Sequence, residues 1–250
     1  MKKFTEQWQD KKVCFLGDSI TDGIGVSKDT VYWNLLGKAT GMKTFGYGLN
    51  GSKFFGLFNQ AKAMYEEHKT DVDAIFLFAG TNDFYGNIPL GDWYIESEKA
   101  VLKNFNTETD ENKEIRKLRK FNFDTTTYKG SINAVLSFLK ENYYDKQIVL
   151  MTPIHRAFAT FGPANVQYDE MHSNSIGLFF DEYVSAVKEA SNIWATELID
   201  LNAVSGFFPL YDKNAEKYFC NTQTDRLHPN FEGHIKLAKI IENKIRAIYV

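Results

Sequence analysis

The chain has 250 residues, of which 44% are hydrophobic and 24% charged, a composition typical of a globular protein with one large domain. The formal net charge of −3 implies no broad basic surface and argues against a nucleic acid as partner. No stretch approaches the roughly 18 apolar residues of a membrane span, and no apolar run follows the first lysines as in a secretory signal. We therefore expect a cytoplasmic protein with no membrane partner.

Short apolar runs alternate with longer amphipathic segments from residue 12 onward. This alternation is typical of a parallel sheet with helices on both faces. The predicted elements, in chain order, are a strand at 12–16, a helix at 30–40, a strand at 43–47, a helix at 54–68, a strand at 74–78, a helix at 127–143, a strand at 147–151, a helix at 175–192, a strand at 197–201 and a helix at 230–249. We therefore predict a single α/β domain over residues 1–250, a three-layer α/β/α sandwich built on a flavodoxin-like five-stranded parallel sheet.

One segment breaks the alternation. Between Asp83 and Thr125 lie about 40 residues with weak periodicity, several aromatic residues and a charged run of both signs at 110–120. We interpret the charged run as a solvated helix face. A connection this long is usually functional or carries short elements of its own. Because it follows a strand end, the insertion at about 84–125 is either a lid over the active face or surface decoration, and both interpretations stay open.

Polar and glycine-rich segments follow the predicted strands at the points where the strands end. They are Gly17-Asp18-Ser19-Ile20-Thr21, Gly48-Leu49-Asn50-Gly51-Ser52, Gly80-Thr81-Asn82-Asp83 and Thr152-Pro153-Ile154-His155-Arg156. Another such segment, Asp225-Arg226-Leu227-His228-Pro229, comes after the last strand and a loop and leads into the last helix. In a doubly wound sheet ligands bind beyond the carboxyl ends of the strands. We therefore expect these segments to meet around one site.

A nucleophilic mechanism needs a hydroxyl, a base, a group that orients the base, and donors for the oxyanion. Ser19 lies at a tight turn entering a helix and would present its hydroxyl, while His228 would accept the proton because imidazole titrates near neutral pH. Asp225 comes shortly before His228, close enough to fix its tautomer. The candidate oxyanion donors are the backbone N–H groups of Ser19 and Gly51 and the side-chain amide of Asn82. The sequence therefore predicts a serine hydrolase acting on small acyl esters.

These blocks resemble those of the SGNH (GDSL-type) hydrolases. The resemblance extends over residues 12–230 and the helix beyond, and it is carried by Gly17-Asp18-Ser19-Ile20, by Gly80-Thr81-Asn82-Asp83 and by Asp225-x-x-His228-Pro229. A further block rests on a single glycine, for which the Asn-Gly context favours Gly51 over Gly48. The resemblance implies an α/β/α sandwich with no metal and no organic cofactor. The roles it implies are Ser19 as nucleophile and first oxyanion donor, Gly51 and Asn82 as further donors, and His228 with Asp225 as the rest of the triad.

Other chemistries fit the sequence less well. An α/β-hydrolase needs Gly-x-Ser-x-Gly at its nucleophile, and no such pentapeptide surrounds Ser19. A phosphatase that forms an aspartyl phosphate usually has a second aspartate two residues after the first, where this chain has Ile20. A metal site could be imagined from Asp18, Asp22, Asp83 and His228. Their spacing is not that of zinc ligands, so we expect Asp18 and Asp83 to bond to the backbone of neighbouring turns.

Several residues after the strand ends are candidates for the substrate lining: Phe54, Tyr85, Trp93, His155 and Arg156. Aromatic rings near a serine nucleophile suit either a sugar ring or an acyl chain, and Arg156 could pair with an anionic substituent. Our hypothesis is an esterase that removes small acyl groups, above all acetyl, from carbohydrates or related small-molecule esters. Acyl transfer, a lipase or thioesterase on the same triad, and a non-catalytic carbohydrate-binding module stay open, and the sequence predicts no oligomeric state.

Overall fold

The central sheet of the protein is parallel and five-stranded. The computed structural model describes residues 7–104 and 112–250. The strands are β1 (Lys12–Gly17), β2 (Lys43–Gly46), β3 (Ala74–Phe78), β6 (Gln147–Met151) and β9 (Glu197–Ile199), in the order β2-β1-β3-β6-β9. Every neighbouring pair runs parallel, and the order is that of flavodoxin-like doubly wound sheets. The predicted fold class is confirmed.

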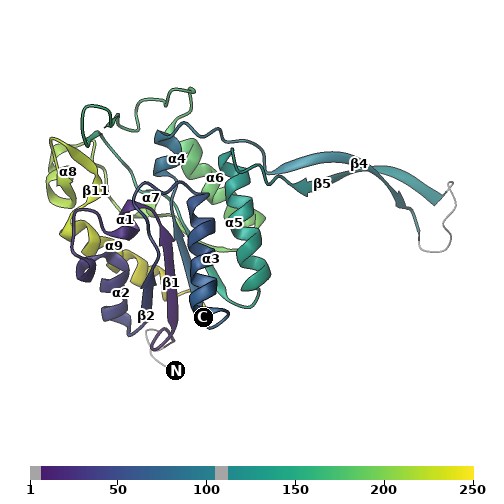
Figure 1. Cartoon of the computed structure of the whole chain (residues 1–250), viewed down its shortest axis with the longest axis horizontal. Helices are drawn as coiled ribbons and strands as arrows, with labels where there is room; N and C mark the ends of the chain where they lie inside the picture. Colours follow the sequence, from purple (N-terminus) through teal and green to yellow (C-terminus); the bar gives the residue numbers. More distant parts are fainter. Residues whose placement is uncertain (1–6, 105–111) are drawn as a thin grey trace.

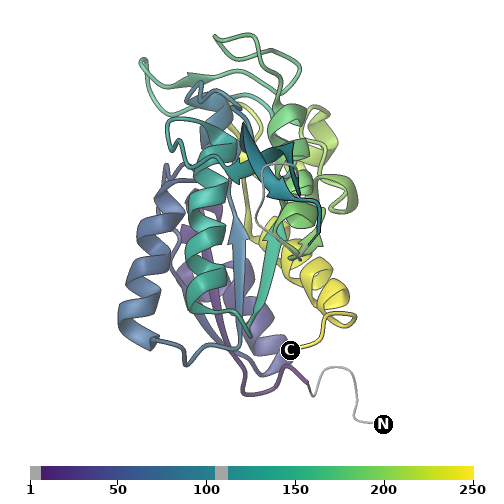
Figure 2. The same cartoon turned by 90° about the vertical axis from the view of Figure 1, so that its right-hand side faces the viewer.

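Two helical layers cover this sheet. The first contains α3 (Gly56–His68), α5 (Tyr128–Asn142) and α6 (Phe180–Ile193), and the second contains α2 (Tyr32–Thr40) and α9 (Phe231–Ile245). Strand β1 shows why both faces are apolar: Cys14 and Leu16 pack in the first layer, whereas Val13 and Phe15 pack in the second. Figure 2 shows the sheet between α3 and α5 on one side and α9 on the other.

Several predicted helices differ from the observed ones at their ends; the helix expected at 230–249, for example, ends at Ile245. The helix expected at 175–192 begins only at Phe180, because the Asn174 side chain accepts the backbone N–H groups of Ile176 and Leu178 and holds this stretch as a loop. The helix expected at 30–40 is preceded by a 3-10 turn, η1 (Lys28–Thr30). Among the described residues no helix is both long and apolar enough to span a bilayer.

The segment between Asp83 and Thr125 is mostly a β-hairpin. After the short helix α4 (Thr81–Tyr85), β4 (Tyr94–Leu102) and β5 (Lys113–Phe121) pair antiparallel along their whole length. Figure 1 shows them projecting from the body, on the side away from α8 and β11. The charged run therefore forms a strand where we expected a helix, apart from residues 110 and 111, which lie outside the described residues. The two interpretations of the insertion, a lid or surface decoration, both remain predictions.

Shorter elements cluster near the carboxyl ends of the parallel strands. They are α1 (Ser19–Asp22), α7 (Leu201–Val204), α8 (Asp212–Tyr218), β7 (Ala159–Thr160), β8 (Val166–Gln167), β10 (Phe219–Asn221) and β11 (Asp225–Pro229). Four of them form an antiparallel sheet in the order β10-β11-β7-β8, which the sequence did not predict. This small sheet holds the last of the polar segments beside the end of β1, because β11 contacts α1.

Candidate active site

Ser19 is the first residue of α1, and only Asp18 separates it from the end of β1. The carboxylate of Asp18 caps the turn by accepting the backbone N–H of Ile20 at 3.0 Å. The side chain of Gln60 bonds to both the N–H and the carbonyl of Gly17, each at 2.8 Å, and so fixes the end of the strand. Ser19 itself is only 3% exposed. Its hydroxyl is therefore held by a rigid and largely buried turn.

The hydroxyl of Ser19 meets His228, which comes from the far end of the chain. Ser19 Oγ lies 2.9 Å from His228 Nε2, and His228 Nδ1 lies 2.9 Å from Asp225 Oδ2. The other carboxylate oxygen, Asp225 Oδ1, accepts the backbone N–H groups of Leu227 and His228 at 3.1 and 3.0 Å. These contacts bring the carboxylate back over its own backbone, so that two side chains of one strand can face each other. The three side chains predicted from the sequence thus form one hydrogen-bonded chain.

Three N–H groups close to Ser19 are available as donors. The backbone N–H groups of Ser19 and Gly51 donate to no acceptor within residues 7–104 and 112–250. The side-chain amide of Asn82 donates one N–H to the carbonyl of Ser52 at 3.0 Å, and its second N–H remains. Ser19, Gly51 and Asn82 line one cavity. Preorganised donors of this kind can stabilise an oxyanion that forms on a substrate bound there.

The loop after β2 contains two glycines, Gly48 and Gly51, and different structural constraints favour glycine at the two positions. Gly51 lines the cavity and has φ +76°, a left-handed conformation that disfavours side chains with a Cβ. Gly48 packs against the backbone of α1, where an added Cβ would lie 2.4 Å from the nitrogen of Asp22. Gly51 is therefore the glycine whose N–H is free beside Ser19, whereas Gly48 allows the loop to approach α1.

Two buried aspartates lie next to the site and hold the backbone around it. Asp18 is 3% exposed and Asp83 is 1% exposed. As expected, both carboxylates accept hydrogen bonds from the backbone. Asp18 accepts the N–H of Ile20, and both oxygens of Asp83 accept the N–H of Phe54, at 3.1 and 2.9 Å. Burial raises the pKa of Asp18 to about 6 and the pKa of Asp83 to about 7. Through Phe54 the Asp83 carboxylate ties α4, which carries Asn82, to the loop that carries Gly51.

The cavity in front of Ser19 has a volume of about 470 Å³. Besides the predicted residues its lining includes Lys53, Phe161 and Gln167. The ring of Phe161 lies 5.3 Å from the ring of His228. Phe161 and Gln167 were missed because they come from a loop whose strands, β7 and β8, have two residues each and show no alternating pattern. Lys53 could have been noticed, since it follows the Gly51 block directly.

The predicted lining residues have different places in the structure. Tyr85 lines the cavity with Ser19, whereas Phe54 is 1% exposed and packs edge-on against Tyr128 in the core. Trp93 is buried at the base of the hairpin, where its indole N–H donates to Glu189 at 2.6 Å. His155 lines a separate cavity of about 370 Å³ and bonds to Glu170 at 2.6 Å. Phe54, Trp93 and His155 therefore do not line the cavity of Ser19, because core packing and other partners hold them elsewhere.

Arg156 is an internal arginine and not a surface one. It is 1% exposed, and its guanidinium donates to the carbonyl and hydroxyl of Thr81 and to the side-chain oxygen of Gln167. Burial lowers its pKa to about 10. With these bonds Arg156 fastens the start of α4 to β8. Its two terminal nitrogens donate to protein groups, and Arg156 does not line the cavity of Ser19, so it is not placed to pair with an anionic substituent there.

Several solved structures share the fold of this chain. Solved structures that resemble the chain include a protein from Lactobacillus plantarum, with 21% identity, a TM-score of 0.73, and coverage of 97% of this chain and 99% of that one. A member of the lipolytic G-D-S-L family from Veillonella parvula has 14% identity and a TM-score of 0.61 over 95% of this chain and 100% of that one. A catalytic mutant of an acetylxylan esterase from Geobacillus stearothermophilus has 17% identity and a TM-score of 0.56, with 97% of each chain covered. At these identities the likeness shows the fold alone.

The sequence itself shows the family. No curated protein matches the chain significantly. The model of the GDSL-like lipase/acylhydrolase family matches residues 15–235, which include the end of β1, the turn at Ser19 and β11. The resemblance found in the sequence blocks is thereby confirmed over most of the chain. The protein belongs to the GDSL-like lipase/acylhydrolase family and is a carboxylic ester hydrolase.

Proposed function

We propose that the protein is a serine esterase that hydrolyses small acyl esters, above all acetyl esters of carbohydrates or related alcohols. The observation that carries the proposal is the chain of hydrogen bonds from Ser19 Oγ to His228 Nε2 and from His228 Nδ1 to Asp225 Oδ2, each 2.9 Å long. A carboxylate only accepts hydrogen bonds, so Asp225 keeps the proton of the imidazole on Nδ1 and leaves Nε2 free to take the proton of Ser19.

The reaction then proceeds in two halves. Ser19 Oγ bonds to the carbonyl carbon of the ester while His228 takes the hydroxyl proton. The resulting oxyanion receives hydrogen bonds from the N–H groups of Ser19, Gly51 and Asn82. His228 gives its proton to the leaving alcohol, the ester bond breaks, and an acyl group remains on Ser19. A water molecule, deprotonated by the same imidazole, attacks this acyl-enzyme and releases the acid.

The chemistry of the cavity favours a small acyl group. Four of its lining residues carry amide side chains: Asn50, Asn82, Asn165 and Gln167. An acyl chain of eight or more carbons would have to cover these amides and remove their water without offering hydrogen bonds in return, which is unfavourable. An acetyl group has little surface to bury, and the hydroxyl groups of a sugar can bond to the same amides.

The test is a comparison of p-nitrophenyl acetate, butyrate and octanoate as substrates of the wild type and of Ser19→Ala. We expect activity to decrease with chain length and to vanish in Ser19→Ala. A matched control is Ser97→Ala, on the exposed hairpin, which we expect to keep full activity. A preference for octanoate over acetate would contradict the small acyl group, and residual turnover in Ser19→Ala would contradict the nucleophile. Acetylation of Ser19 without release of acetate, seen by mass spectrometry, would indicate acyl transfer in place of hydrolysis.

A further inference from the structure

A second cavity lies beside the one that contains Ser19. Its volume is about 310 Å³, and Tyr85 lines both cavities. Two chain segments separate them. Asn82 at the start of α4 lines the first cavity, and Asn87, just after α4, lines the second. Likewise Gln167, the last residue of β8, lines the first cavity, and the next residue, Tyr168, lines the second. The two cavities are therefore neighbouring compartments on either side of Tyr85.

We propose that this second cavity is a subsite for a sugar unit, so that the substrate is an acylated oligosaccharide that extends from Ser19 past Tyr85. The inference rests on the proposed function, because it assumes that an ester is cleaved at Ser19. The α-helical rise is about 1.5 Å per residue, so Tyr85 lies about 4.5 Å further along α4 than Asn82. A ligand that leaves the oxyanion donors in this direction reaches the second cavity within about one sugar ring.

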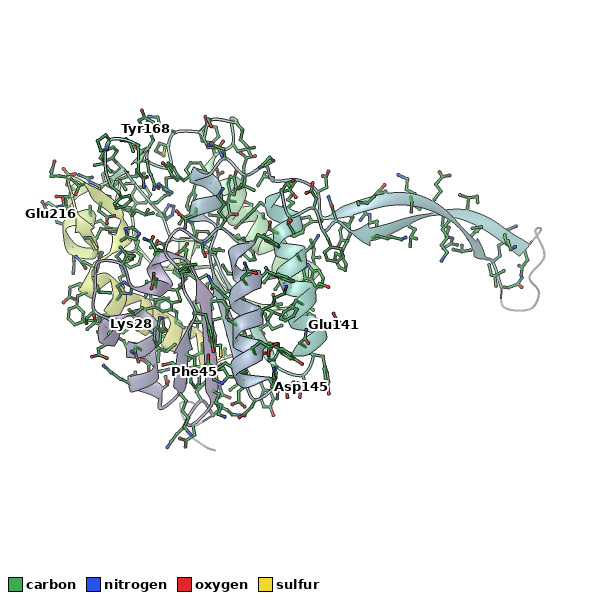
Figure 3. The ribbon with its side chains drawn as sticks, in the orientation of Figure 1. Lys28, Phe45, Glu141, Asp145, Tyr168 and Glu216 are labelled. Atoms are coloured by element: carbon green, nitrogen blue, oxygen red, sulfur yellow. The ribbon has the colours of Figure 1, made fainter. Side chains whose placement is uncertain are left out.

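The exposed rings of the second cavity provide a platform. Tyr168 is 65% exposed, and its ring lies 5.4 Å from the ring of His172 at an interplanar angle of 37°. Figure 3 shows Tyr168 at the end of the molecule opposite Asp145. The C–H faces of a sugar ring are apolar and can pack on such rings, as apolar groups do on aromatic side chains in other binding sites. Rings this exposed contribute little to the hydrophobic core, so their contact surface is free for a ligand.

Hydrogen-bonding groups surround this platform. Tyr168 Oη, His172 Nε2 and the hydroxyls of Ser173 and Ser175 make no side-chain hydrogen bond to any residue of the described chain. The other ring nitrogen, His172 Nδ1, bonds to Asp169 at 2.8 Å and so orients the imidazole. Sugar hydroxyls both donate and accept and therefore match this mixed set of groups. A hydrocarbon chain would leave all of them without partners.

The walls of the second cavity are fixed before any ligand binds. The side-chain oxygen of Asn87 accepts the backbone N–H of Ser175 at 2.8 Å. Asn174 donates to the carbonyl of Phe84 at 3.1 Å and to the hydroxyl of Tyr183 at 3.0 Å. These bonds connect the loop that carries His172 to α4 and to α6. A preformed site loses little conformational entropy on binding, which is the condition for useful affinity from a few contacts.

The experiment compares mono-O-acetylated monosaccharides with the corresponding 1,4-linked disaccharides, in pairs built from xylose, glucose and N-acetylglucosamine. For at least one pair we expect the disaccharide ester to have a kcat/KM about tenfold higher, which is the size of one aromatic contact. Tyr168→Ala should remove this gain, and Tyr168→Trp should keep it. The matched control is Tyr144→Ala, a tyrosine that is 82% exposed and adjoins Asp145 at the other end of the molecule.

The hydrolysis of p-nitrophenyl acetate distinguishes a failure of the proposed esterase function from a failure of the sugar subsite. If the wild type does not hydrolyse it, or if Ser19→Ala does, the proposed function fails. If the wild type hydrolyses it but gains nothing from the second sugar in any pair, the subsite alone is refuted. A gain that survives in Tyr168→Ala would refute it as well. So would a loss in Tyr168→Ala that is confined to octanoate esters, because the cavity would then hold an acyl chain.

Discussion

Asp225 and His228 face each other from one short strand, with Asp225 Oδ2 2.9 Å from His228 Nδ1. In a regular strand residues three apart point to opposite faces. Here Asp225 Oδ1 accepts the backbone N–H groups of Leu227 and His228, so the same carboxylate shapes the backbone and orients the imidazole. The two functions reside in different oxygens of one side chain, and a substitution can therefore separate them.

Asp225→Asn should abolish most activity and leave the fold intact. The amide oxygen can still accept the two backbone N–H groups, but an amide N–H would then face His228 Nδ1. That nitrogen would have to accept, which puts the proton on Nε2, where it cannot take a proton from Ser19. We expect kcat to decrease by about 10³- to 10⁴-fold, as for the same change in other serine hydrolase triads, with an unchanged thermal unfolding temperature. The control is Asp29→Asn, an exposed aspartate of η1. A similar loss in both variants would argue against the orienting role.

Asn82→Ala should act on the transition state. The second N–H of its amide is available for the oxyanion, whereas the first is bonded to Ser52. We expect kcat to decrease by about 10²- to 10³-fold with little change in KM. Asn165→Ala provides the contrast, because Asn165 lines the same cavity but is not among the proposed donors; it should raise KM more than it lowers kcat. If Asn82→Ala changed only KM, the residue would position substrate and would not stabilise the oxyanion.

Sequence patterns predicted the parts of the molecule in which the residue pattern of an element matches its burial in the folded protein. The run Val13-Cys14-Phe15-Leu16 is apolar throughout because both faces of β1 are covered, so its type and place could be read directly. Ser19, Asn82, Asp225 and His228 were found because each adjoins a strand end or occurs in a short block of fixed spacing. Their meeting in space follows from the parallel topology, which the alternation of elements implies.

The parts that could not be predicted depend on contacts between distant residues or lack a periodic signal. The hairpin β4–β5 is exposed to solvent on both faces, so its charged residues show no apolar alternation and suggested a helix. Arg156 is charged and yet 1% exposed, which becomes intelligible only once its bonds to Thr81 and Gln167 are known. Sequence alone gave neither contact.

Replacing the hairpin should leave ester selectivity unchanged. The N–H of Asn122 donates to the carbonyl of Trp93 at 3.0 Å, so the two ends of the arm are already adjacent. Residues 94–121 can therefore be exchanged for a two-residue Asn-Gly turn, while the bond from Asn133 to the Trp93 carbonyl keeps the base in place. We expect the ratio of octanoate to acetate hydrolysis to stay that of the wild type. An altered ratio, in a variant with an unchanged unfolding temperature, would support the lid interpretation.

The buried histidine of α9 should make the fold sensitive to acid. His234 is fully buried, its Nδ1 accepts the backbone N–H of Tyr32 at 3.1 Å, and its ring stacks on the ring of Tyr32. Burial lowers its pKa from 6.5 to about 4. Between these two values the unfolded chain binds a proton that the folded chain does not bind. The free energy of unfolding therefore decreases as the pH falls, by about 3 kcal/mol from this group across the whole window.

The measurement is urea unfolding of the wild type and of His234→Asn at several pH values between 7.5 and about 4. The asparagine oxygen can replace Nδ1 as acceptor for Tyr32 but does not titrate. His234→Asn should be the less stable protein at neutral pH, because the ring contact is lost, and the difference should shrink as the pH falls. Asp18 and Asp83 titrate in both proteins, with raised pKa values that favour the folded state in acid, so their effect cancels in this difference. If His234→Asn followed the wild type at every pH, His234 would carry its proton in the folded protein as readily as in the unfolded chain.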